Sequence, residues 1–152
     1  MAYVLKAFIG KKKNLKGIEK EYQSAKIVEL KNNYCIIPVT NSLFNEINKM
    51  RLSTKTNFYF YLTKDFENDI LEIVLNKKIA YVESEYFGGN GGHLGVVWEN
   101  GKRIYDGKLH KKTLNEILKV LGVKKSLFKD EFETLGLNKH RFTENWLDEY
   151  KN

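Results

Sequence analysis

The stretch that decides the fold is IAYVESEYFGGNGGHLGVVWENGKRIYD, residues 79–106. Apolar and polar side chains alternate over residues 79–87 and again over 93–99, which is the period of a β-strand with two different faces. Asn100-Gly101 is a strong hairpin signal, because both residues tolerate the positive φ angles of a two-residue turn. The sequence therefore predicts three consecutive antiparallel strands, a meander over about residues 79–106.

The first two of these strands are joined by a glycine-rich segment, Gly88-Gly89-Asn90-Gly91-Gly92. In phosphate-binding glycine loops the glycines lie between a strand and a helix, whose N-terminal N–H groups reach the anion. Strands flank this segment on both sides, which favours a hairpin loop. A concave nest of N–H groups that holds an anion stays open as an alternative.

Outside the meander, strands are indicated by short apolar runs. Residues 2–10 are apolar with one lysine, and residues 26–39 form a hairpin that turns at Asn32-Asn33 and places Cys35 in the core. The aromatic run NFYFYL, residues 57–62, predicts a further strand from its residue types.

Helices are predicted where a capping residue precedes an apolar stripe of helical period. The predicted caps are Thr40 or Ser42, Thr63, Thr113 and Thr143. The segment SLFKDEFETLGL, residues 126–137, predicts another short helix that is stopped by Gly136. This order of elements predicts a single α+β domain over residues 1–152, with a largely antiparallel sheet covered by helices.

The composition is that of a globular protein, with 42% hydrophobic and 30% charged residues among 152. Because Cys35 is the only cysteine, an internal disulfide is excluded and a thiolate metal site is disfavoured. No apolar run has the length of a membrane span, and the N-terminus lacks the order of a secretory signal. We therefore expect a cytoplasmic protein with no membrane association, no metal and no cofactor.

The net charge of +7 is unevenly distributed. Lysines are concentrated in residues 1–33, and the basic patch expected there consists of Lys11, Lys12, Lys13 and Lys16, whereas residues 130–150 are acidic. Such a charge distribution can steer a nucleic acid or an acidic protein to the basic end. A solvated lysine-rich surface is the alternative interpretation. The chain has only three arginines, which disfavours sequence-specific reading of bases.

The candidate catalytic residues lie beside the glycine segment. Glu83 and Glu85 are two positions apart on one strand, so their carboxylates share a face about 7 Å apart and could bind a cation or transfer protons with His93. A solvated strand face is the alternative. His110 and His140 each precede a threonine by three positions, one residue too long for the paired histidine motif of two-histidine phosphoesterases.

Three segments together resemble one family of small bacterial proteins whose activity is uncharacterised. They are IPVTNSLFNEI (37–47), AYVESEYFGGNGGHLGVVWENGK (80–102) and DEFETLGLNKHRFTENW (130–146). The glycine segment and the HR-T-W tail are the most specific parts. The chain departs from the family pattern at His93, where the family tends to have glutamine.

By analogy with immunity proteins of similar size, the resemblance implies a non-enzymatic protein that neutralises a bacterial toxin by direct binding. The alternatives are a nucleic-acid- or nucleotide-binding protein that uses the lysine-rich N-terminal region, and a small enzyme with a site near Glu83, Glu85 and His93. The residues expected at the binding site are Glu83, Glu85, Tyr86, Phe87, Asn90, His93, His140, Arg141 and Trp146.

Overall fold

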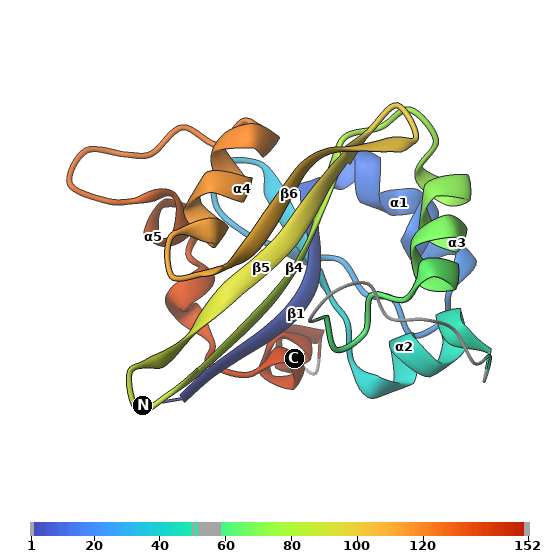
Figure 1. Cartoon of the computed structure of the whole chain (residues 1–152), viewed down its shortest axis with the longest axis horizontal. Coiled ribbons are helices and arrows are strands. Elements are labelled where there is room, and N and C mark those ends of the chain that lie inside the picture. The colour runs from blue at the N-terminus through green and yellow to red at the C-terminus, as the bar shows by residue number, and fades with distance from the viewer. Residues whose placement is uncertain (1, 50, 52–58, 151–152) are drawn as a thin grey trace.

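The computed structural model describes residues 2–49, 51 and 59–150. Its centre is a six-stranded antiparallel sheet with the strand order β2-β3-β1-β4-β5-β6 (Figure 1). The strands are β1 (Ala2–Lys11), β2 (Val28–Glu29), β3 (Tyr34–Pro38), β4 (Ile79–Phe87), β5 (Asn90–Glu99) and β6 (Lys102–His110). The predicted α+β fold and the three-strand meander are confirmed, and the meander continues to His110.

The turn between β4 and β5 is shorter than predicted. Phe87 pairs with Asn90, so only Gly88 and Gly89 form the turn, with φ angles of 60° and 84°. Gly91 already belongs to β5, where a Cβ atom would lie 1.9 Å from the carbonyl oxygen of Glu85. The glycines therefore permit a tight hairpin, and strand pairing uses residues that the sequence assigned to a loop.

Helices cover both faces of the sheet. One face carries α1 (Lys12–Glu21), α2 (Asn41–Asn48) and α3 (Lys64–Val74), while the other carries α4 (Thr113–Leu121), α5 (Glu131–Leu135) and the 3-10 segments η1 (Leu137–Lys139) and η2 (Thr143–Tyr150). In Figure 1 the sheet runs diagonally between these two groups. Alternate side chains along the strands pack into two separate hydrophobic cores. Phe8, Tyr81 and Trp98 pack toward α1–α3, and Ile9 and Val97 pack toward α4.

The aromatic run before α3 does not form the predicted strand. Residues 57–58 lie outside the described part of the chain, and Tyr59–Leu62 belong to none of the six strands of the sheet. The backbone N–H groups of Phe60 and Tyr61 instead donate to the carboxylate of Glu83, at 2.6 and 2.9 Å. A side chain thus supplies the acceptors that a neighbouring strand would have offered. The rings of Tyr59 and Tyr61 are buried above the sheet.

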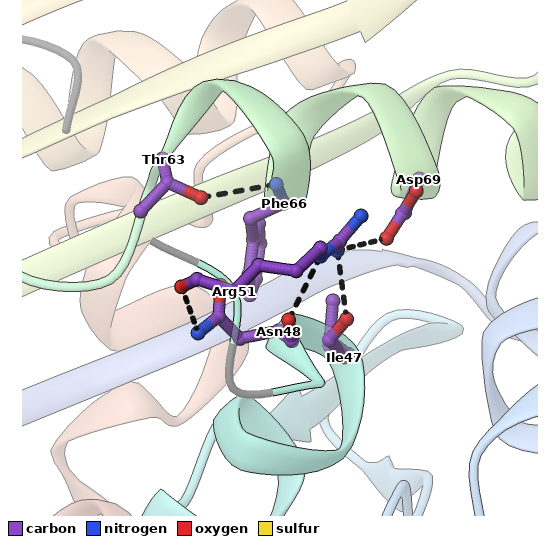
Figure 2. Close-up of polar contacts among 6 residues, drawn as sticks. All are labelled: Ile47, Asn48, Arg51, Thr63, Phe66 and Asp69. Atoms are coloured by element: carbon purple, nitrogen blue, oxygen red, sulfur yellow. Dashed lines mark hydrogen bonds and ion pairs between the residues drawn. The ribbon is translucent and has the colours of Figure 1, made fainter. Parts of the chain in front are cut away.

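Two of the four predicted caps are confirmed. The Thr40 hydroxyl accepts from Leu43 N–H at 3.2 Å, and the Thr63 hydroxyl accepts from Phe66 N–H at 3.1 Å (Figure 2). The other two threonines bind elsewhere. Thr113 is already the first residue of α4 and donates to the carbonyl of Lys108, and Thr143 binds the backbone of β1.

Arg51 joins the end of α2 to α3 (Figure 2). Its guanidinium donates to the carbonyls of Ile47 and Asn48, at 3.0 and 2.8 Å, and to the carboxylate of Asp69. The carbonyls at a helix C-terminus lack intrahelical partners, so the cation both satisfies them and complements the helix dipole. The hydrogen bond to Asp69 raises the pKa of Arg51.

The C-terminal segment protects the first half of β1. Because β3 pairs only with residues 7–11 of β1, no described strand lies beside the residues before Ala7 on that side of β1. Val4 N–H donates to the carbonyl of Arg141 at 2.7 Å, and Lys6 N–H donates to the Thr143 hydroxyl at 3.1 Å. Trp146 is buried behind this contact. The HR-T-W residues therefore close an edge that would otherwise be open to pairing.

Candidate functional site

The sheet divides the residues expected at its glycine-rich end. Glu83, Glu85 and Phe87 are on the α1–α3 face, whereas Tyr86 and His93 are on the α4 face. This follows from strand alternation, because residues that neighbour each other in sequence point to opposite sides. The enzyme alternative requires Glu83 and His93 in one site. The structure places them on opposite faces of the sheet, so these acid–base residues are not brought together.

Glu83 is buried and fully engaged. Its carboxylate accepts from the N–H groups of Phe60 and Tyr61 and from the Tyr81 hydroxyl, the last at 2.7 Å. Burial and the neighbouring Glu83 carboxylate raise the pKa of Tyr81, which stays protonated and donates. Three donors leave little room for Glu83 to take a substrate proton, so the geometry gives this residue a structural role.

Glu85, Phe87 and Asn90 lie near the tip of the hairpin and are exposed. The side chain of Glu85 has no hydrogen bond or ion pair among the described residues, and Asn90 pairs with Phe87 across the turn. A cavity of about 280 Å³ lies beside Glu85, with Lys6 and Leu109 in its lining. This end of the face therefore offers an open surface of mixed charge.

A larger cavity, of about 510 Å³, lies on the opposite face of the sheet. It contains three of the expected residues, Tyr86, His93 and Arg141. The remaining lining comes from the start of β1, the β4–β5 turn and the segments from α4 to η1: Ala2, Tyr3, Gly89, Lys111, Leu114, Asn115, Asp130, Phe132 and Asn138. Its volume is within the range of small-molecule sites.

His93 lies in the wall of this cavity. Its Nδ1 atom is 2.5 Å from the Oγ of Ser84, which is buried directly opposite on β4. Burial lowers the pKa of His93 to about 4, because a charged imidazole loses hydration there. The ring is neutral at neutral pH. No carboxylate among the described residues orients the imidazole, so the pair lacks the third member of a catalytic triad.

The other expected residues of the C-terminal tail are held by local contacts. His140 Nε2 is 3.0 Å from Glu149, and the His140 ring meets Trp146 edge-on at 4.7 Å. Trp146 is 1% exposed and belongs to the core. Among these residues only Arg141 has an exposed side chain that reaches a cavity.

The basic patch is interrupted by aromatic and acidic side chains. The Lys11 ammonium lies 4.4 Å from the centre of the Tyr34 ring, and Lys12 pairs with Glu29 at 3.8 Å. Lys16 shares a hollow with Glu19 and Glu149, and Lys13 is exposed at the start of α1. Because carboxylates alternate with the lysines, the patch is poorly suited to a continuous polyanion.

One feature of the surface was not expected from the sequence. The loop between α4 and α5 exposes Leu127 and Phe128, which are 81% and 96% accessible to solvent. Phe128 also has a φ angle of 66°, in the left-handed region that bulky residues rarely adopt. This loop projects beyond the two helices (Figure 1). The sequence predicted that Leu127 and Phe128 belong to a helix, which is wrong, because α5 begins only at Glu131, after its cap Asp130.

No protein-family model, curated protein or solved structure matches this chain. Over the described ranges, no group of three or more histidine, cysteine or acidic side chains has the arrangement of a metal site. The helices of the same ranges include none that is both long and apolar enough to cross a membrane.

Proposed function

We propose that this chain is a protein-binding module of the immunity type, which docks an acidic partner in the cytoplasm through the α4–α5 loop. The observation that carries the proposal is the exposure of Leu127 and Phe128 at 81% and 96%. Two adjacent apolar side chains at the tip of a projecting loop contribute almost nothing to the core. Apolar groups gathered on a surface are typical of contact sites.

The backbone of the loop supports the same conclusion. A phenylalanine with a φ angle of 66° costs about 1 kcal/mol relative to a relaxed conformation. The side chain gains no packing in return, since it is 96% exposed. Strain that folding does not require is found at functional sites. Aromatic anchors of this kind often carry a large share of the binding energy at protein interfaces.

The charges beside the loop indicate the chemistry of the partner. Lys124, Lys125 and Lys129 flank the apolar pair and are exposed. An apolar pocket with an acidic rim complements such a surface, and the net charge of +7 adds long-range attraction. The immunity role is the form of protein binding implied by the resemblance of the HR-T-W tail and the glycine segment. A protein that neutralises a toxin by covering it needs no catalytic residue of its own.

The test is complex formation with the products of the adjacent genes. Each product is co-expressed with this chain, and the complex is isolated and its dissociation constant measured. We expect one product to bind and to be toxic when expressed alone, and Phe128→Ser to weaken its binding by about 30-fold. Leu109→Ser is the control, because it removes an apolar side chain of β6 that is 56% exposed and lies outside the α4–α5 loop. Equal affinity for wild type and Phe128→Ser would refute the docking site.

A further inference from the structure

We propose that the 510 Å³ cavity binds a small anion that carries a planar ring, with an aryl phosphate or an aryl carboxylate as the headgroup chemistry. The cavity lies between the start of β1, the β4–β5 turn and the segments from α4 to η1. Leu127 and Phe128 are not part of its lining. A small-molecule site here goes beyond protein binding, and either proposal can fail without the other.

The walls of the cavity form a continuous series of rings. Tyr3 meets Phe132 edge-on at 5.5 Å, Phe132 lies 6.5 Å from His93, and His93 lies 5.0 Å from Tyr86. Tilted and edge-on arrangements leave ring faces and edges available to a further planar group. A ligand with a planar ring can therefore continue this series.

Several polar groups of the lining are already engaged, which fixes the shape of the cavity. The Asn115 amide donates to Asp130 at 3.1 Å and accepts from Phe132 N–H at 2.9 Å. Asp130 also accepts from Glu133 N–H, and the Tyr3 hydroxyl donates to the carbonyl of Leu137 at 2.9 Å. Asp130, the only carboxylate among the described lining residues, is therefore occupied by donors from the protein.

The cations of the lining are free of such engagement. Within the described part of the chain, the side chains of Lys111 and Arg141 form no hydrogen bond or ion pair. Lys111 comes from the turn between β6 and α4, and Arg141 from the segment between η1 and η2. Two cations against the single carboxylate of Asp130 leave the cavity with a net positive charge. Arg141 can bind a phosphate or carboxylate through two parallel N–H groups, and Lys111 can supply a second contact.

His93 contributes a hydrogen-bond donor rather than a charge. If the buried Ser84 hydroxyl donates to Nδ1, the proton of the neutral ring is on Nε2, which then donates into its surroundings. Because burial lowers the pKa of His93 to about 4, this ring does not add to the positive charge near neutral pH. Recognition of the anion rests on Lys111 and Arg141.

The experiment is calorimetric titration of the full chain at about pH 7 with phenyl phosphate, benzoate, inorganic phosphate and benzyl alcohol. We expect saturable binding of phenyl phosphate or benzoate, and the stronger of the two identifies the headgroup. Inorganic phosphate lacks the ring and benzyl alcohol lacks the charge, so both should bind at least about tenfold more weakly. Amide NMR signals of His93 and Asn115 should shift during the titration.

Variants locate the binding. Arg141→Gln and Lys111→Gln should each weaken binding by about tenfold or more, since each removes a charged contact. Lys112→Gln is the matched control, because it makes the same charge change one position away and outside the lining. The proposal is overturned if neither aryl anion binds below about 10 mM, or if all three variants bind as the wild type does.

Discussion

The carboxylate of Glu83 holds the backbone of Tyr61, whose N–H group donates to it at 2.9 Å across 22 positions of the chain. Phe60 N–H and the Tyr81 hydroxyl bind the same carboxylate. This single buried side chain therefore fixes Tyr59–Leu62 on the sheet, although that segment is not a strand. The position of Glu83 beside Glu85 suggests a catalytic role, but its contacts give it a structural one.

Replacement of Glu83 should destabilise the protein. In Glu83→Gln one of the two oxygens becomes an NH2 group, which turns a donor toward the N–H of either Phe60 or Tyr61, so we expect the free energy of unfolding to fall by about 2–3 kcal/mol. Denaturant titration measures it. Glu85→Gln is the control, since Glu85 is exposed and should change stability by less than about 0.5 kcal/mol. Equal stability of both variants would contradict the structural role of Glu83.

The stability of the protein should depend on the protonation of His93. Burial lowers its pKa from 6.5 to about 4 in the folded state, so between these values the unfolded chain binds a proton that the folded protein does not. The stabilising contribution is complete above about pH 6.5 and is lost as the pH falls toward 4. Between about pH 7 and pH 4, wild type should lose about 3 kcal/mol more stability than His93→Gln. Parallel stability profiles for the two proteins would rule out this linkage.

Thr143 should stabilise the open edge of β1 through its hydroxyl. Thr143→Val keeps the shape but leaves Lys6 N–H without its acceptor, so we expect a loss of about 1–2 kcal/mol in thermal or denaturant unfolding. Thr143→Ser keeps the hydroxyl and should recover most of that loss. If the serine variant is no more stable than the valine variant, the methyl group rather than the hydrogen bond matters.

The sequence predicts those structural features that depend on residues close together in the chain. Alternation and the Asn100-Gly101 turn were sufficient for the meander, and Thr63 was sufficient for the start of α3. Contacts between residues far apart in the chain were not predicted, because hydrophobic periodicity and turn-forming residues indicate only local structure. Glu83 binding to Phe60 is one example, and Thr143 binding to Lys6 is another.

The candidate site was predicted in part for the same reason. The sequence placed Tyr86 and His93 at one end of the sheet, and both line the larger cavity with Arg141, which the fold brings from the C-terminal tail. Alternation along residues 79–87 also predicted that Phe87 lies with Glu83 and Glu85 on the face opposite to Tyr86, and the structure has this arrangement. The exposure of Phe128 was not predicted, because Phe128 was assigned to a helix over residues 126–137, whereas that helix begins at Glu131.

The most direct test of the central claim is to measure both stability and partner affinity in Phe128→Gly. Glycine adopts a φ angle of 66° without strain, and the side chain it removes is 96% exposed. If Phe128 is retained for docking, the free energy of unfolding stays equal or rises by up to about 1 kcal/mol, while affinity for the partner falls about 30-fold. Wild-type affinity in this variant, or a loss of stability greater than about 1 kcal/mol, would contradict the account.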